Sequence, residues 1–426
     1  MKKFPIGISN FKEVIKEDYY YIDKSLFIEE VIDSSAKSIL IPRPRRFGKT
    51  LNMSMLHAFL DIKKSEENAS LFEHLKIRET KSWELQGKYP VIYLSFKDIK
   101  ELTYVESIKK VTSILQDFLD DYKAIISRDV LDERDFNYLN KLFKGEEVDP
   151  SRLSNFLILF SRVLHKVYDQ NVVILIDEYD SCIIKSWQEG YYNEMITFMR
   201  NFLSAGFKDN DYLYKGVITG ILRVAKESIF SGLNNLRVYS VLNQTFSDKF
   251  GLQEEEVKTL LLSISEEEQF DKVKEWYNGY QFGKSQVYNP WSIINFADSI
   301  EEGVQPYWVN TSANELIEVL LTNANADLEK KLTGLIDGQV MESEISETTI
   351  FKDLERGAEK TVLGLLLFNG YLTIDYAKQE DINYYYGLKI PNKEVAIVYK
   401  QMLERLLNKA NNVNSSEILT ALLDQE

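Results

Sequence analysis

The sequence predicts an α/β fold in which helices connect the strands of a parallel β-sheet. Five apolar runs of β type precede residue 245, at 38–41, 91–96, 172–176, 216–219 and 238–242. Helical patterns separate the earlier runs, and this alternation is typical of parallel strands joined by crossover helices. Two of the runs end in motifs of functional residue types, a glycine-lysine-threonine turn and an adjacent pair of carboxylates.

The first motif lies in the loop that follows the run 38–41. It ends in Gly48, Lys49 and Thr50, and a helical pattern begins at Leu51. A strand, a loop and a helix in this order are the context that a phosphate-binding P-loop requires. Gly48 lets the backbone approach a phosphate, and the first amides of the helix then face the anion with the helix dipole behind them. Lys49 is expected to contact the β- and γ-phosphates and Thr50 to bind Mg²⁺.

This motif predicts a site for ATP and Mg²⁺. The predicted nucleotide-binding residues are Arg45, Arg46, Phe47, Gly48, Lys49, Thr50 and Leu51. The loop lacks the first glycine of the usual pattern and has Arg43 there, between Pro42 and Pro44. Bulky side chains resist the backbone conformation that this position often needs. Two hypotheses remain for the loop arginines: they add cationic donors around the triphosphate, or they form an exposed basic turn on a site with poor turnover.

The second motif is the carboxylate pair Asp177-Glu178 at the end of a buried apolar run. Asp177 suits a Walker B partner of Mg²⁺, and Glu178 suits the residue that activates a water. Thr219 ends the next run, where the additional-strand branch of P-loop ATPases has a γ-phosphate sensor; the alternative is an ordinary strand-end threonine. Arg223 is a further sensor candidate, in cis or on a neighbouring subunit, with a surface ion pair as the alternative. The predicted catalytic residues are Lys49, Glu178, Thr219 and Arg223, and the predicted metal ligands are Thr50 and Asp177.

Length and composition set limits on the class of protein. A chain of 426 residues is too long for one ordinary hydrophobic core, and 44% apolar residues are enough for packed interiors. A net charge of −15 excludes a globally basic nucleic-acid surface but leaves room for a local basic patch. One cysteine and three histidines give neither a disulfide framework nor a zinc motif. No signal peptide and no apolar run of about 20 residues is visible, so we expect a cytoplasmic protein without a membrane anchor.

We expect three regions: a P-loop ATPase domain at 1–244, a helical lid at 245–355, and a winged-helix-like α+β segment with a helical tail at 356–426. Two aromatic clusters in the lid, at 276–280 and 287–291, contain asparagine but few cations. This composition favours packing of the lid over stacking on nucleic-acid bases.

The winged-helix-like segment is predicted from the order of its elements. An apolar helix at 362–368 precedes two strand-like runs, 371–376 and 383–390, and another helix follows. The usual function of such a unit is nucleic-acid binding. The linker 378–381 between the runs is acidic and would contact DNA poorly, so we expect a structural wing.

Taken together, these motifs resemble the AAA-ATPase-like family of bacterial proteins. The resemblance is carried by Arg43–Thr50 with Leu51–Leu56, and by Tyr21–Ser25, Val91–Phe96, Asp177–Asp180, Tyr277–Tyr280 and Tyr307–Ser312, in this order. It extends from about residue 5 to about residue 400. An arginine in place of the first loop glycine is a habit of this family. Defence against foreign DNA and mobile elements are settings that the resemblance suggests.

Members of this family often end in a PD-(D/E)XK nuclease domain. That module would begin near residue 400 and needs an acidic strand end followed by a Glu-x-Lys pair. Residues 401–426 contain only a helical pattern. We therefore expect no nuclease activity from this chain.

The leading functional hypothesis is an ATP-binding, Mg²⁺-dependent P-loop ATPase or nucleotide switch that controls an effector. The expected partners are the nucleotide and a protein partner or nuclease effector; homo-oligomerisation and DNA binding are further candidates. Two alternatives come from other classes of protein. One is a non-hydrolysing interaction module with a partly relic loop, and the other is a DNA-processing protein that acts through the winged-helix-like segment.

Overall fold

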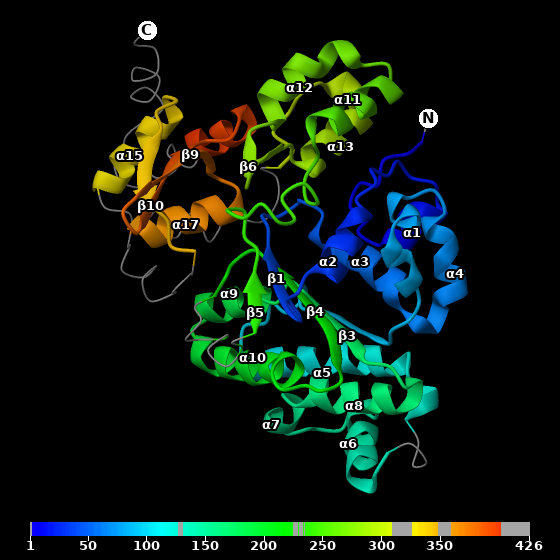
Figure 1. Cartoon of the computed structure of the whole chain (residues 1–426). Helices are drawn as coiled ribbons and strands as arrows, with labels where there is room; N and C mark the ends of the chain where they lie inside the picture. The colour runs from blue at the N-terminus through cyan, green and yellow to red at the C-terminus, as the bar shows by residue number, and fades with distance from the viewer. Residues whose placement is uncertain are drawn as a thin grey trace. The chain divides into compact units, whose positions relative to one another are not determined.

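The computed structural model describes residues 2–126, 131–224, 229, 233, 235–308, 326–347 and 359–401 (Figure 1). Contacts divide the chain into two compact units, which we call the sheet unit and the C-terminal unit. The sheet unit comprises Gly7–Arg43 and Gly48–Lys249. The C-terminal unit comprises Met1–Ile6, Pro44–Phe47 and Phe250–Glu426.

The sheet unit is built on a five-stranded parallel sheet with the strand order β2-β3-β4-β1-β5. The strands are β1 Ser38–Pro42, β2 Val91–Ser95, β3 Val172–Asp177, β4 Leu213–Gly220 and β5 Leu236–Val238. β1 and β3 are buried along their whole length, as continuous apolar strands in covered parallel sheets usually are. The predicted α/β class with a parallel sheet is confirmed. β4 lies between β1 and β3, so the carboxyl ends of these three strands are neighbours.

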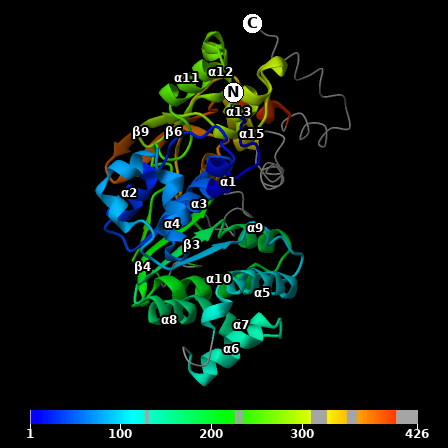
Figure 2. The ribbon, with the colours of Figure 1, turned by 90° about the vertical axis from the view of Figure 1, so that its right-hand side faces the viewer.

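Helices lie on both sides of this sheet (Figures 1 and 2). One side carries α1 Phe11–Lys16, α2 Leu26–Asp33, α3 Lys49–Leu60 and α4 Ser65–Ala69, and the other carries α5 Tyr104–Asp120, α8 Phe156–Tyr168 and α10 Tyr192–Phe207. The sheet unit also contains α6 Glu133–Phe143, α7 Pro150–Leu153 and α9 Ser181–Gln188, and the short 3-10 helices η1 Ile62–Lys64, η2 Ser70–Phe72, η3 Lys76–Glu79, η4 Lys81–Leu85 and η5 Lys123–Ile125. Within the described ranges, no helix of either unit is long and apolar enough to cross a membrane.

Two strands, β4 and β5, differ from the prediction by more than one residue at a boundary. β4 begins at Leu213 rather than at residue 216, and the fifth strand ends at Val238 rather than beginning there. The Asn243 side chain accepts a hydrogen bond from the Ser240 amide at 2.7 Å. Because a local side chain takes this amide, the ladder with β1 does not continue past this point.

The C-terminal unit combines helices with two small antiparallel sheets. Its elements are α11 Glu254–Ser263, η7 Glu267–Gln269, α12 Phe270–Tyr277, β6 Tyr280–Phe282, β7 Ser285–Val287, α13 Pro290–Asp298, η8 Ile300–Glu302, α15 Ala326–Ile336, β8 Met341–Glu344, α17 Glu359–Asn369, β9 Thr373–Glu380, β10 Asn383–Lys389 and a helical stretch at 393–401. β6 pairs with β7, and the other sheet has the order β8-β10-β9. The region 245–355, predicted as a helical lid, therefore also contains β6, β7 and β8.

The predicted order of helix, hairpin and helix is present in α17, β9, β10 and the final helical stretch. The predicted acidic linker at 378–381 is wrong, because β9 extends to Glu380 and the turn lies at 381–382. Lys378 occupies the exposed strand in ion pairs with Glu342 of β8 at 2.8 Å and with Glu380 at 3.0 Å. The winged-helix character of this segment stays a prediction.

A buried carboxylate joins separate segments of the C-terminal unit. Glu394 is fully buried. It accepts hydrogen bonds from Ser292 Oγ at 2.8 Å and from the Trp308 amide at 2.7 Å. Burial raises the pKa of Glu394 to about 7, and the donated hydrogen bonds oppose this effect only in part. The native unit therefore keeps a proton on Glu394 at pH values where the unfolded chain has lost it.

We expect the wild-type C-terminal unit to lose stability relative to Glu394→Gln as the pH rises from about 5 to about 8. A glutamate in the unfolded chain has a pKa of about 4.3, whereas Glu394 in the folded chain has a pKa of about 7. The folded state therefore binds the proton more tightly, which stabilises it at low pH. This stabilisation is lost as the pH rises through the folded pKa. The full span between the two pKa values is roughly 4 kcal/mol, of which roughly 3 kcal/mol falls between about pH 5 and about pH 8. Urea unfolding at several pH values measures the difference, with exposed Glu301→Gln as the control. A difference that does not change with pH would contradict the expectation.

Candidate nucleotide-binding site

The carboxyl ends of the central strands bring three predicted site residues together. Thr50 Oγ1 donates a hydrogen bond to Asp177 Oδ2 at 2.8 Å, and Thr219 Oγ1 donates one to Asp177 Oδ1 at 2.6 Å. Asp177 and Thr219 are fully buried. Burial raises the pKa of Asp177 above its ordinary value, and the two hydroxyl donors partly offset this. Thr50 in the first turn of α3 and Thr219 near the end of β4 thus converge on the carboxylate that ends β3.

Lys49 and Gly48 form the start of helix α3. Gly48 is the residue before the helix and has a φ of 83°, in the left-handed region that favours glycine. Lys49 is only 5% exposed, and its Nζ donates to the carbonyl oxygen of Arg43 at 3.1 Å. The ammonium group therefore faces back along the loop. Leu51 follows in the first helical turn and is half-buried.

Arg43, which occupies the place of the missing glycine, is a structural residue. Its guanidinium is fully buried and donates to the carbonyl oxygens of Pro42 at 2.9 Å, Tyr239 at 2.7 Å and Phe246 at 3.2 Å. Burial lowers the pKa of Arg43 to about 9. The hypothesis that this arginine is a cationic donor for the triphosphate is wrong, because its donors hold the segment after β5 against the end of β1.

The next loop residues have contacts within the C-terminal unit. The Arg46 guanidinium carbon lies 3.9 Å from the ring centre of Trp291. Phe47 is 1% exposed, and its ring centre lies 4.9 Å from that of Tyr280. Arg45 is half-buried. The left-handed backbone conformation in this part of the loop falls on Arg46, with a φ of 70°.

Glu178 follows directly after β3. Its backbone has a φ of 52°, which is uncommon for a residue with a side chain. Its Oε2 accepts a hydrogen bond from Ser181 Oγ at 3.2 Å, so the carboxylate is oriented by the first residue of α9. A partly exposed carboxylate beside the Asp177 cluster is suited to orienting a water molecule.

Sequence reasoning missed the structural roles of Tyr179 and Asp180. Asp180 is buried and accepts hydrogen bonds from the amides of Ile221 at 2.8 Å and Leu222 at 2.7 Å. The Tyr179 hydroxyl donates to the Leu222 carbonyl at 2.8 Å. A Cβ on Gly220 would come within 2.5 Å of Asp180 Oδ1, so this position needs glycine. Both side chains fix the segment that leaves β4.

Arg223 lies in this fixed segment. Its side chain is half-buried, and its charge acts on the buried Tyr179 phenol, whose pKa is raised mainly by burial. The hydrogen-bonded cluster of Thr50, Asp177 and Thr219 does not include Arg223. Its predicted role as a sensor of the γ-phosphate stays a prediction.

The side chains available to bind a metal suit Mg²⁺, which takes only part of its ligands from the protein. Thr50 and Asp177 offer a hydroxyl and a carboxylate at one place. In the described part of the chain, no group of three or more His, Cys, Asp or Glu side chains could hold a metal ion. Mg²⁺ usually keeps several waters and binds through one or two protein oxygens plus substrate phosphates. Two protein ligands are therefore sufficient if the nucleotide supplies the others.

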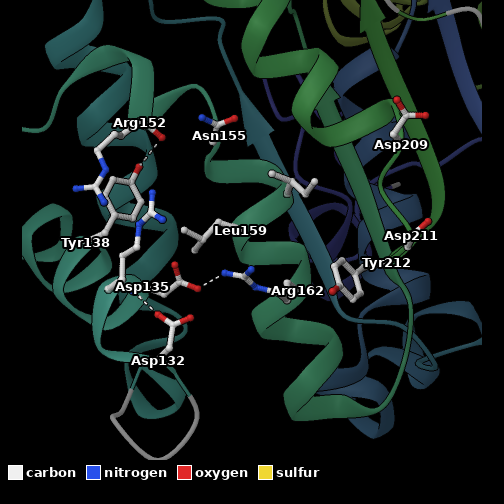
Figure 3. A pocket seen from close by; sticks show the side chains of 12 residues that line it. Asp132, Asp135, Tyr138, Arg152, Asn155, Leu159, Arg162, Asp209, Asp211 and Tyr212 are labelled. Atoms are coloured by element: carbon white, nitrogen blue, oxygen red, sulfur yellow. Dashed lines mark hydrogen bonds and ion pairs between the residues drawn. The ribbon is translucent and has the colours of Figure 1, made fainter.

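A separate cavity of about 550 Å³ lies at the other end of the sheet. Arg152 and Asn155 line it together with residues of α6 and α8, and Asp211 and Tyr212 line it just before β4 begins (Figure 3). Thr219 lies near the opposite end of β4, roughly 20 Å along the strand. This cavity is therefore distinct from the nucleotide motif.

These features define a mixed α/β protein with a P-loop-type site at the carboxyl ends of a five-stranded parallel sheet. The chain belongs to the AAA-ATPase-like family, described as predicted AAA-ATPase, whose family model matches residues 5–230. A protein of Azotobacter chroococcum mcd 1, described as an uncharacterized protein in the vnfD 5' region, is 28% identical over 418 residues, which are 97% of this chain and 72% of that protein. The structure of Drosophila ORC bound to AT-rich DNA and Cdc6 aligns over 93% of this chain and 91% of that chain at 9% identity. Its TM-score of 0.21 is too low to support a conclusion.

Proposed function

We propose that this chain is an ATPase or nucleotide switch that binds ATP with Mg²⁺ at the loop that precedes α3 and at the first turn of that helix. The observation that carries the proposal is the shared carboxylate of Asp177, which accepts hydrogen bonds from both Thr50 and Thr219. A P-loop threonine and a Walker B aspartate must meet in this way if they are to hold one Mg²⁺. Membership of a family of predicted AAA-ATPases supports the same function.

The residues divide the work of binding and hydrolysis. Gly48 and the amides at the start of α3 would receive the phosphates, and Lys49 would contact the β- and γ-phosphates. Thr50 and Asp177 would hold Mg²⁺, which neutralises charge on the transferring phosphoryl group. Glu178 would orient the water that attacks the γ-phosphate, so that ATP and water give ADP and phosphate. Thr219 would sense whether the γ-phosphate is present.

The experiment is a titration of the purified protein with ATP, in Mg²⁺ and in EDTA, followed by calorimetry and thermal unfolding. A ligand that binds only the native state stabilises it by about 2.7 kcal/mol at a concentration of about 100 times its Kd. We expect this stabilisation in Mg²⁺ and a much smaller one in EDTA. Phosphate release measures turnover in the same samples. Absence of binding in both conditions would refute the proposal.

The outcomes also separate the alternative functions. Binding without phosphate release would favour a nucleotide switch or interaction module. A rise in turnover on adding DNA, lost at high salt, would favour a DNA-processing role, because phosphate contacts weaken steeply with salt. We propose that the nucleotide state is read by a protein partner, such as a nuclease effector, or by another copy of this chain. Co-purification in ATP compared with ADP tests this.

A further inference from the structure

The P-loop is divided between the two compact units. The chain leaves the sheet unit after Arg43, passes through the C-terminal unit as Pro44–Phe47, and returns to the sheet unit at Gly48. The middle of a phosphate-binding loop thus belongs, by its contacts, to the unit that does not contain the sheet.

Phe47 is inserted among aromatic residues of the C-terminal unit. Its ring lies edge-on to Tyr280, with centres 4.9 Å apart, and its centre lies 5.1 Å from that of Phe282. Pro44 packs closely against Gly370. If Gly370 had a Cβ atom, that atom would lie only 3.2 Å from the Cβ of Pro44. With only 1% of Phe47 exposed, these contacts anchor the middle of the loop.

Arg46 is anchored beside Phe47 in an unfavourable backbone conformation. Its φ of 70° is rarely adopted by a residue with a side chain. Such a conformation persists only where the surroundings determine it. Here the guanidinium stacks 3.9 Å from the ring centre of Trp291, an arrangement that attracts the cation to the face of the indole. The stack and the buried neighbour together hold the loop in this shape.

The aromatic residues are themselves rigidly held. Trp291 lies in the first turn of α13. Its amide donates to Asn289 Oδ1 at 2.9 Å, and its Nε1 donates to the Tyr307 carbonyl at 3.1 Å. Tyr280 follows Gly279, where any Cβ would come within 2.0 Å of the Pro391 carbonyl oxygen. We call Tyr280, Phe282 and Trp291 the aromatic seat. These contacts fix Trp291 and Tyr280 within the C-terminal unit.

We propose that the aromatic seat positions the P-loop for nucleotide binding and that, in return, nucleotide binding changes the C-terminal unit. The residues held by the seat and the predicted phosphate-binding residues Gly48–Thr50 are consecutive, so both sets of contacts constrain one short loop. Any ligand whose affinity depends on the loop conformation must act back on whatever holds that conformation, by an equal free energy. This inference rests on the proposed function and names its means of regulation.

Two members of the aromatic seat belong to the aromatic clusters of the sequence. Tyr280 and Trp291 lie in the two clusters at 276–280 and 287–291 that composition assigns only to packing. In the structure Trp291 contacts Arg46 and Tyr280 contacts Phe47. Phe282 of β6 completes the seat from the hairpin between the clusters.

The test compares Trp291→Leu with Trp276→Leu. Both tryptophans are half-buried residues of the C-terminal unit, but only Trp291 contacts the loop. We expect the Kd for MgATP, measured by calorimetry, to rise at least about tenfold in Trp291→Leu and to stay within about twofold of the wild type in Trp276→Leu. Trp291→Phe keeps an aromatic face for Arg46 and should restore most of the affinity.

Hydrogen exchange tests the return direction. In the wild type and in Trp291→Phe, MgATP should slow amide exchange in β6 and in the first turn of α13, and in Trp291→Leu it should not. If Trp291→Leu only weakened the packing, its amides would exchange faster than those of the wild type to the same extent with and without MgATP. Arg46→Ala, at an exposed side chain, removes the stack without disturbing the interior and should raise the Kd at least about threefold.

The failure of this inference and that of the proposed function are distinguishable. If Trp291→Leu and Arg46→Ala bind MgATP like the wild type and β6 shows no nucleotide-dependent exchange, the seat does not position the loop, although the ATP site stands. If the wild type does not bind MgATP, the proposed function is wrong and this inference with it. If Trp291→Leu does not fold, the exchange experiment on the wild type still decides.

Discussion

Replacing Lys49 with alanine is expected to abolish the stabilisation of the protein by MgATP. Lys49 begins α3, and its Nζ already points into the loop, 3.1 Å from the Arg43 carbonyl oxygen. A phosphate offers this ammonium group a full negative charge, whereas the carbonyl offers only a dipole. We therefore expect the terminal phosphates to replace the carbonyl as its partner when ATP binds. Without the ammonium group, these phosphates lose their principal cation from the protein.

The expected effect of this change is large. We expect ATP to bind at least about 100-fold more weakly, which corresponds to about 2.7 kcal/mol. At a nucleotide concentration of about 100 times the wild-type Kd, the wild type gains about 2.7 kcal/mol and the variant only about 0.4 kcal/mol. For a domain of the size of the sheet unit, the wild-type gain in stability corresponds to a Tm shift of roughly 5–10 °C. Differential scanning fluorimetry with and without MgATP resolves this difference.

Two further variants separate the charge of Lys49 from its packing. The side chain is only 5% exposed, so alanine also removes buried methylene groups. Lys49→Met keeps most of that volume and should melt near the wild type without nucleotide, yet show no MgATP shift. Lys109→Ala, at an exposed lysine of α5, makes the same change of net charge and should keep the full shift. A full shift in Lys49→Met would mean that the nucleotide binds elsewhere.

The meeting of Thr50, Asp177 and Thr219 could be predicted from the sequence because it depends on strand direction. Asp177 and Thr219 lie at the carboxyl ends of apolar runs, and Thr50 follows the loop that leaves a third run. These runs alternate with helical patterns. In an open parallel sheet these ends lie along one edge, and ligands bind there. Small errors in strand boundaries, such as those of β4 and β5, do not change which residues lie at that edge.

The directions of the loop side chains could not be predicted in the same way. Arg43 turns inward because its guanidinium finds carbonyl oxygens of residues 196 and 203 positions further along the chain. Arg46 and Phe47 turn toward Trp291 and Tyr280, which are even more remote in sequence. Local pattern shows a basic turn, but only tertiary contacts decide which side chains are structural. For the same reason Asp180 was visible in its motif while its role, accepting amides beyond β4, was not.

Replacing Glu178 with glutamine is expected to leave MgATP binding intact and to slow hydrolysis at least about tenfold. Glu178 follows the buried strand β3 and its Oε2 accepts a hydrogen bond from Ser181 Oγ at 3.2 Å. Glutamine has the same shape and keeps an oxygen that can accept this bond. It has no negative charge with which to orient and polarise a water molecule. Binding, which depends on Lys49 and on the shared carboxylate of Asp177, should therefore survive.

A comparison with Asp177→Asn shows whether the two carboxylates have different roles. Asp177 accepts hydrogen bonds from both Thr50 and Thr219, and it is the proposed Mg²⁺ ligand. Its replacement should weaken binding in Mg²⁺ toward the level in EDTA, whereas Glu178→Gln should retain the full difference between the two conditions. Glu194→Gln, at an exposed glutamate of α10, makes the same chemical change away from the site and should alter neither measurement.

Phosphate release under single-turnover conditions gives the hydrolysis rate without a contribution from product release. Turnover by Glu178→Gln at the wild-type rate would show that another group orients the water, and Glu178 would then be only a structural residue at the end of β3. Wild-type protein that binds MgATP but releases no phosphate, alone or with DNA, would favour the non-hydrolysing interaction module. In that case the charge of Glu178 would be dispensable, while Lys49 and Asp177 would still be required, because binding and hydrolysis place separate demands on the same site.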